Sequence, residues 1–225
     1  DWVLISSSLF LGVAALFVPY LSELLKRKMF KPICKIDFNL SAPDCHLTYW
    51  TGLKEGENEV FYFRFLVTNI GKSTIKNCEN VLEEVWRLNN TTLKFKKVKN
   101  FTPVNLVWSA ANNRSYIDIN PQRRNYCDLG YLPTLEYQKD RPINSFPDYH
   151  GDDIKFVLTL STKLNSQPSC FPPGKYGLKI LTSSENAKSQ TSFFKITWSG
   201  IWKNNEIDLF KELVVEKVPG SNFVC

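Results

Sequence analysis

Alternation of large apolar residues with polar ones is the feature that most restricts the fold of this chain. The pattern has a period of two and recurs in separate runs from residue 59 onward. Such a period is typical of strands in a half-buried sheet, since successive side chains point to opposite faces. The apolar sets are Phe61, Phe63, Phe65 and Val67; Ile154, Phe156, Leu158 and Leu160; Tyr176, Leu178 and Ile180; and Phe194, Ile196 and Trp198.

Residues that favour turns separate these runs. They are Asn69-Ile70-Gly71, Asn89-Asn90, Pro121, Gly130, Gly151-Asp152 and Pro172-Pro173-Gly174. Many short strands joined by turns predict a mainly β fold of the β-sandwich type. Near the end, Asn204 or Asn205 can cap one short helix over residues 206–212, and residues 213–218 follow as a last strand.

The N-terminus has a different composition. Residues 2–21 carry no charge, and a helix of about 20 residues is long enough to cross a bilayer. A cleaved signal peptide would need a basic start and a shorter apolar core, and a buried core helix would show a polar face. We therefore expect a transmembrane helix over residues 1–25. Within it, Ser8, Gly12 and Ala15 form a strip suited to helix packing, although ordinary membrane-helix composition also explains them.

Half of the net positive charge follows this apolar run. The chain carries a net charge of +6, and residues 1–35 hold +3 of it, from five basic and two acidic side chains. The remaining residues are nearly balanced, which argues against nucleic acid as a partner. Membrane lipids are the expected partner of the cluster, which consists of Lys26, Arg27, Lys28 and Lys31. The positive-inside rule then predicts an outside N-terminus and a cytoplasmic domain.

These features divide the chain into three parts. We expect a transmembrane helix over residues 1–25, a basic linker over 26–35, and a β-sandwich over 36–225 with an insertion at about 100–153. In a reducing compartment Cys34 and Cys45, the pair best placed for a local bridge, should stay unpaired. The even number of cysteines and the sequons at Asn90 and Asn100 would instead suit an exported domain. We follow the positive-inside rule and keep the prediction of a cytoplasmic domain.

Two motifs carry a resemblance to a known family. Residues 63–78, FRFLVTNIGKSTIKNC, resemble the Val-x-Asn-x-Gly strand-turn-strand of bacterial immunoglobulin-like domains, including the CARDB (cell-adhesion-related) type. Residues 171–180, FPPGKYGLKI, resemble the late strand of the same domains. The ending over residues 197–210 is similar to that of single-span bacterial membrane proteins. The resemblance implies an immunoglobulin-like sandwich on a membrane anchor, and it implies no activity.

Residues able to do chemistry are few. His46 and His150 are the only histidines, and neither lies in a recognisable catalytic motif. Asp148, His150, Asp152 and Asp153 lie close in sequence and give a metal-dependent enzyme its only support, but a solvated acidic turn explains them more simply. Phosphate-binding and nucleophile-elbow motifs are absent from the sequence, so we expect no enzyme, no metal and no cofactor.

Surface aromatic and basic residues are the remaining candidates for binding. A pocket at the insertion would be lined by Trp108, Tyr116, Tyr126 or Tyr137, and Trp202 lies outside the strand alternation that makes Trp198 a core residue. The basic run at residues 93–99 predicts a lysine-protected edge strand rather than a nucleic-acid or lipid patch.

The sequence thus favours a membrane-anchored, non-enzymatic interaction or accessory subunit with a protein partner or membrane complex. A sensor domain that binds a small molecule or carbohydrate is the alternative, and a metal-dependent enzyme is the third hypothesis.

Overall fold

The structure is a computed structural model that describes residues 18–23, 30–49, 59–109, 114–139 and 145–223. The strands of its first sheet are β1 (Cys34–Asp37), β2 (Cys45–Tyr49), β3 (Glu59–Asn69), β7 (Val107–Trp108), β9 (Arg124–Pro133), β10 (Phe156–Leu158) and β11 (Cys170–Phe171). Those of the second are β4 (Ile75–Asn89), β5 (Lys94–Lys97), β6 (Val104–Asn105), β8 (Tyr116–Ile119), β12 (Gly174–Ser183), β13 (Gln190–Trp198) and β14 (Leu213–Val218). In the described part of the chain, residues 18–23 are helical, and two short helices, α2 (Leu135–Lys139) and α3 (Glu206–Glu212), and a 3-10 turn, η1 (Gly220–Asn222), follow later.

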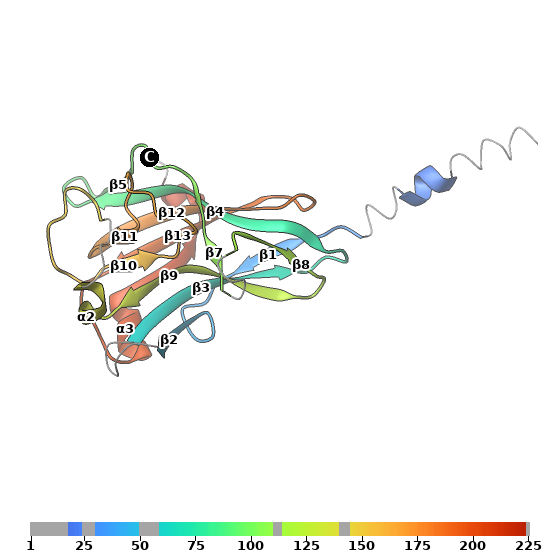
Figure 1. Cartoon of the computed structure of the whole chain (residues 1–225). Helices are drawn as coiled ribbons and strands as arrows, with labels where there is room; N and C mark the ends of the chain where they lie inside the picture. The colour runs from blue at the N-terminus through green and yellow to red at the C-terminus, as the bar shows by residue number, and fades with distance from the viewer. Residues whose placement is uncertain (1–17, 24–29, 50–58, 110–113, 140–144, 224–225) are drawn as a thin grey trace, which may run out of the picture.

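Both sheets are antiparallel, and the core lies between them (Figure 1). The first sheet has the order β1-β3-β9-β10-β11, with β2 also paired to β3 and β7 to β9. The second has the order β14-β13-β12-β4-β5, with β6 and β8 also paired to β4. This confirms the predicted mainly β architecture of two packed sheets.

The alternating apolar residues form the core, as predicted. Phe61, Phe63 and Phe65 of β3 are fully buried, and the ring of Phe65 lies 5.6 Å from that of Phe194 in the opposite sheet. The other predicted sets, including Trp198, are buried as well. Because burial of one large apolar side chain contributes about 1.5–3 kcal/mol, these rings are a main source of stability.

The segment expected as an insertion instead supplies part of the sandwich. Residues 100–153 contain β6 to β9 and α2, and β9 pairs with β3 from Val60 to Thr68. The turn predicted at Gly130 was wrong, because Gly130 lies inside β9 opposite Phe63. A Cβ atom there would lie 2.6 Å from the Phe156 ring, so glycine permits a close approach between strands.

Two other local predictions are confirmed. Asn205 caps α3, since its side-chain oxygen accepts a hydrogen bond from the Asp208 backbone N–H at 2.9 Å. The Glu206 carboxylate accepts from the Leu47 N–H at 2.8 Å and so joins α3 to β2. The basic run forms β5, at one end of the strand order of the second sheet, as expected for a lysine-protected edge.

The predicted transmembrane helix lies mostly outside the described residues. Residues 18–23 are helical, but within the described part of the chain no helix is both long and apolar enough to cross a membrane. The helix-packing residues Ser8, Gly12 and Ala15 and the cations Lys26, Arg27 and Lys28 also lie outside the described ranges. Lys31 is described and exposed.

The turn at Asn69-Ile70-Gly71 holds the segment through which the chain reaches the sandwich. The Ile70 N–H donates to the Ile33 carbonyl at 2.9 Å, and the Lys72 N–H donates to the Lys31 carbonyl at 3.2 Å. The buried Asn69 amide donates to the Ser73 and Ile119 carbonyls, at 2.8 Å each, and so fixes the turn. The hairpin from β3 to β4 therefore fastens residues 31–33 to the domain.

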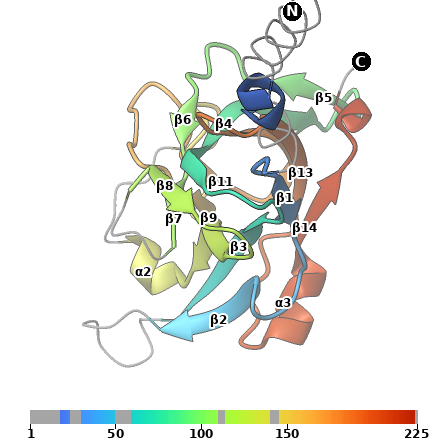
Figure 2. The same cartoon turned by 90° about the vertical axis from the view of Figure 1, so that its right-hand side faces the viewer.

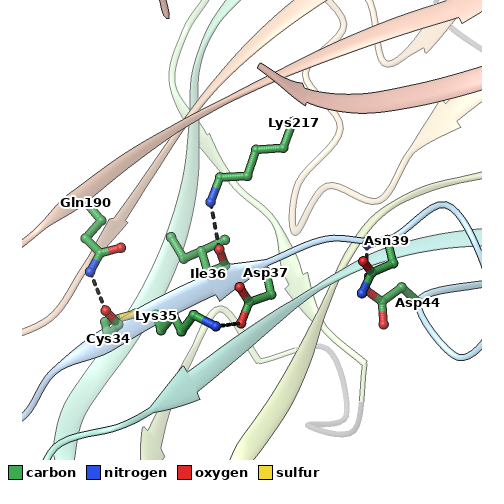
Figure 3. Close-up of polar contacts among 8 residues, drawn as sticks. All are labelled: Cys34, Lys35, Ile36, Asp37, Asn39, Asp44, Gln190 and Lys217. Atoms are coloured by element: carbon green, nitrogen blue, oxygen red, sulfur yellow. Dashed lines mark hydrogen bonds and ion pairs between the residues drawn. The ribbon is translucent and has the colours of Figure 1, made fainter. Parts of the chain in front are cut away.

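Strand β1 is tied to both sheets. It pairs with β3 along one edge, and Figure 2 views the sandwich from the end at which β1 begins. Figure 3 shows two side chains of the second sheet reaching its backbone: Gln190 donates to the Cys34 carbonyl, and Lys217 donates to the Ile36 carbonyl at 2.7 Å. The linker and β1 are thus held as part of the folded domain.

Candidate functional site

The outer face of the first sheet carries a polar cluster. Strand alternation buries Phe63 and Phe65 and turns the side chain of Arg64, which lies between them, outward. A shallow depression of about 260 Å³ lies on this face, between β2, β3 and β9. We define the Arg64 cluster as His46, Tyr62, Arg64, Ser109, Tyr126 and Asp128.

A bulge sets the partners within this cluster. The pairing of β3 with β9 shifts by one residue between Phe63 and Arg64, so that Arg64 lies opposite Asp128. Without the shift, Arg64 would oppose Leu129, a core residue. The bulge therefore places a carboxyl group beside the guanidinium on the outer face.

Arg64 is held by three neighbours. Its guanidinium carbon lies 4.5 Å from the centre of the Tyr126 ring, a cation–π contact. Its Nη2 atom donates to the Pro43 carbonyl at 2.6 Å and lies 3.4 Å from His46 Nδ1. Its Nε atom is buried and has no hydrogen-bond partner among the described residues. A ligand in the depression could therefore reach the guanidinium, which lines it, but not the buried Nε atom.

Burial shifts the pKa values of two neighbours in opposite directions. Burial lowers the pKa of His46, and the positive charge of Arg64 lowers it further, so the imidazole is neutral at neutral pH. Burial raises the pKa of Asp128, against the hydrogen bond from Ser109 and the charge of Arg64. Ser109 Oγ donates to Asp128 Oδ1 at 2.5 Å. The cluster thus combines a cation, a neutral imidazole and a hydrogen-bonded carboxyl group.

This arrangement suits recognition better than nucleophilic catalysis. The Ser109 hydroxyl proton is directed to Asp128, and no hydrogen bond joins Ser109 to His46 in the described part of the chain. Arginine, tyrosine and histidine groups on a rigid sheet instead match the carboxylate, carbonyl and hydroxyl groups of a ligand.

The environment of His46 predicts its titration. In an NMR pH titration, we expect the His46 ring protons to give a pKa below 6.5, and Arg64→Gln should raise that pKa because it removes the adjacent positive charge. Since the folded-state pKa is depressed, the contribution of His46 favours folding above pH 6.5 and is lost as the pH falls through the folded pKa. An unchanged His46 pKa in Arg64→Gln would contradict the contact.

The predicted ligand-binding aromatics do not form a common wall. Trp108 is only 1% exposed, and its indole N–H donates to the Cys78 carbonyl at 3.2 Å, so it belongs to the core. Tyr137 is also buried. Trp202, predicted to be exposed, is half-buried against Phe61, with ring centres 5.3 Å apart.

The other two aromatics are accessible but lie on different sheets. Tyr116 of β8 is 59% exposed and lines a depression of about 510 Å³ beside Glu79 and Glu185. Tyr126 of β9 belongs to the Arg64 cluster, and its hydroxyl donates to Asp44 at 3.3 Å. Of the predicted set, Tyr126 alone joins that cluster.

The acidic residues around His150 do not converge. Arg87 Nη1 donates to both carboxylate oxygens of Asp148, at 2.8 Å each, and the Tyr149 hydroxyl donates to Asp153. Among the described residues, no group of three or more potential ligands could hold a metal ion. These carboxylates instead stabilise the loop before β10.

The described cysteines are buried thiols, and Cys34 and Cys45 form no disulfide. Cys34 is instead hydrogen-bonded to Cys78, a neighbour far away in the sequence. Burial raises the pKa of Cys45 to about 12, so this thiol is protonated at neutral pH.

Sequence reasoning missed Arg64, Ser109 and Asp128. The alternation around Phe63 could have marked Arg64 as outward-facing, but nothing local pairs it with a residue far along the chain. Comparison of the sequence with protein-family models and with curated proteins gives no match, so the functional argument depends on the fold and on this side-chain chemistry.

Proposed function

We propose that this chain is a membrane-anchored, non-enzymatic interaction subunit that binds a protein partner through the outer face of its first sheet. The observation that carries the proposal is Arg64, a guanidinium that Tyr126 and Pro43 hold in place and that lines the depression on this face. A donor fixed in this way binds a partner's carboxylate or carbonyl with little loss of conformational entropy.

The composition of this face supports a protein partner. Tyrosine and arginine are enriched at the centres of protein interfaces, where they bury large areas and also form hydrogen bonds. Tyr49, which is 63% exposed, and Tyr62 line the depression beside Arg64. The sheet beneath them is fixed by the core, so the face is ordered before binding.

The sequence supports the membrane anchor and the orientation. The uncharged residues 2–21 match the thickness of a bilayer, and the cations at 26–31 follow directly. On this proposal the domain is cytoplasmic and the N-terminus lies outside. An immunoglobulin-like relationship of the sandwich is part of the same proposal, based on the two motifs that resemble such domains.

Photo-cross-linking in native membranes tests the binding face. A photoreactive amino acid at Tyr49 should give a cross-linked adduct with one partner protein, whereas the same group at Leu93, which is 74% exposed in the turn between β4 and β5, should not. Arg64→Gln should abolish the Tyr49 adduct by removing the guanidinium donors, while its thermal unfolding midpoint shows whether the domain remains folded.

Two outcomes would contradict the proposal. One is equal adduct formation from Tyr49 and Leu93, and the other is an adduct from Tyr49 that persists in a folded Arg64→Gln variant. Fractionation of the same membranes, with the chain recovered in the soluble fraction, would contradict the anchor.

A sensor domain is the second candidate, favoured by the depression beside Tyr116. An exposed tyrosine ring next to the carboxylates of Glu79 and Glu185 offers a surface for stacking and hydrogen bonding with a sugar. Sugar binding by the full chain that Tyr116→Ala abolishes would favour this function over the first.

A further inference from the structure

Three turns meet the incoming chain at one end of the sandwich. They are residues 70–74 between β3 and β4, residues 120–123 between β8 and β9, and residues 184–189 between β12 and β13 (Figure 1). Thr74 Oγ1 donates to Asn120 Oδ1 at 3.0 Å, and the Asn186 side chain donates to the Thr74 carbonyl at 2.9 Å. Ser73 Oγ donates to the Phe30 carbonyl. These contacts make the three turns and residues 30–33 one surface, which we call the linker end.

A depression of about 740 Å³ opens at the linker end. Its wall combines the cations Lys31 and Lys188 with the polar side chains of Ser73 and Asn186. Phe30 and Ile33 line the same depression and are 51% and 47% exposed. It therefore offers both positive charge and apolar surface.

The cations at this end lack acidic partners. Lys31, Lys72, Arg123 and Lys188 are exposed, and none forms an ion pair within the described ranges. Glu185 lies in the third of these turns, and its carboxylate and that of Asp118 both accept hydrogen bonds from Asn77. With these four cations and the one carboxylate of Glu185, the linker end carries an excess of positive charge.

Apolar side chains lie among these cations. Ile70, at the tip of the β3–β4 turn, is 47% exposed, like Ile33 beside it. Exposed aliphatic and aromatic side chains interleaved with lysines are typical of surfaces that rest at the boundary between lipid headgroups and acyl chains.

We propose that the linker end is a docking surface for anionic phospholipid headgroups, which holds the sandwich against the membrane that anchors it. This inference rests on the proposed anchor, because residues 2–21 reach the domain through Phe30 and Lys31. The backbone bonds from Ile70 and Lys72 to residues 31–33 fix these cations relative to the anchor. Anionic lipid is concentrated in the cytoplasmic leaflet, where the charge rule puts this domain.

Full-length chain reconstituted into vesicles tests the docking. In a Cys225→Ser background, Ser189→Cys carries an environment-sensitive dye at the linker end, and Ile207→Cys, 77% exposed on α3, carries it at the other end. The described native cysteines are buried and so resist labelling. We expect the dye at position 189 to shift to shorter wavelength when phosphatidylserine is added to phosphatidylcholine, and the dye at position 207 to stay unchanged.

Charge removal gives a matched comparison. The variant Lys31→Gln/Lys72→Gln/Lys188→Gln should lose the shift, because each lysine removed lowers the ratio of docked to undocked domain by about fivefold. Lys94→Gln/Lys96→Gln/Lys99→Gln removes the same charge from the β5 region and should retain it. If both variants lose the dye shift, or if neither does, the proposal of a docking surface at the linker end is overturned.

Two further outcomes separate this proposal from the anchor. Retention of the chain in vesicles after an alkaline wash, without any dye shift, would overturn docking and leave the anchor standing. Failure of retention would overturn the anchor itself. If an acidic peptide in solution shifts the dye at position 189 in the absence of anionic lipid, the linker end would be assigned to a protein ligand instead.

Discussion

Replacement of Trp108 by Ala should lower the free energy of unfolding by about 3–5 kcal/mol, as for other buried Trp-to-Ala changes. The indole is 1% exposed, and its N–H donates to the Cys78 carbonyl, which links β7 of the first sheet to β4 of the second. The variant loses the buried rings and leaves that carbonyl without its partner. Urea unfolding followed by circular dichroism measures the change.

Tyr116→Ala is the matched control, because both residues were predicted to line the same pocket. Tyr116 is 59% exposed, so its removal should change stability by no more than about 0.5 kcal/mol. Trp108→Phe keeps most of the apolar volume and should fall between the two. Similar stabilities for Trp108→Ala and Tyr116→Ala would contradict the core position of Trp108.

Substitution of Gly71 by Ala should destabilise the domain by about 1–3 kcal/mol, the range for forcing an extra methyl into a packed site. A Cβ atom at this position would lie 2.5 Å from the Ile33 backbone nitrogen and still closer to the Lys31 carbonyl oxygen. Backbone atoms cannot move aside as a flexible side chain can. The linker would therefore separate from the turn.

Hydrogen exchange measures that separation directly. The N–H groups of Ile70 and Lys72 donate to the linker, so they should exchange faster in Gly71→Ala, whereas the Tyr176 amide in the centre of the second sheet should change only with global stability. Ile70→Ala, a change of an exposed neighbour, should leave both rates near wild type. Unchanged exchange at Ile70 and Lys72 in Gly71→Ala would show that the linker is held by other contacts.

Local patterns were sufficient to predict several of the individual elements. The inward set of Phe61, Phe63, Phe65 and Val67 follows from the period of two, and α3 follows from an asparagine cap, Asn204 or Asn205, placed before an acidic first turn. Both depend on interactions within a few residues, which the order of residues specifies directly. The same reasoning identified the turn at Gly71, although not what that turn holds.

Tertiary structure alone decided which distant residues meet. The segment around Gly130 looked like a turn because glycine favours turns, but pairing with β3 and the ring of Phe156 made it a strand. A bulge makes Arg64 and Asp128 neighbours. Trp108, which was predicted to line a pocket, lies in the core. Strand order and register result from competition among all possible pairings for burial and hydrogen bonds, and this competition leaves no local periodicity in the sequence. The strands with a clear alternation and the helix α3 were therefore determined by the sequence of each segment, whereas the central part of β9, the Arg64 cluster and the linker end exist only because the whole chain folds.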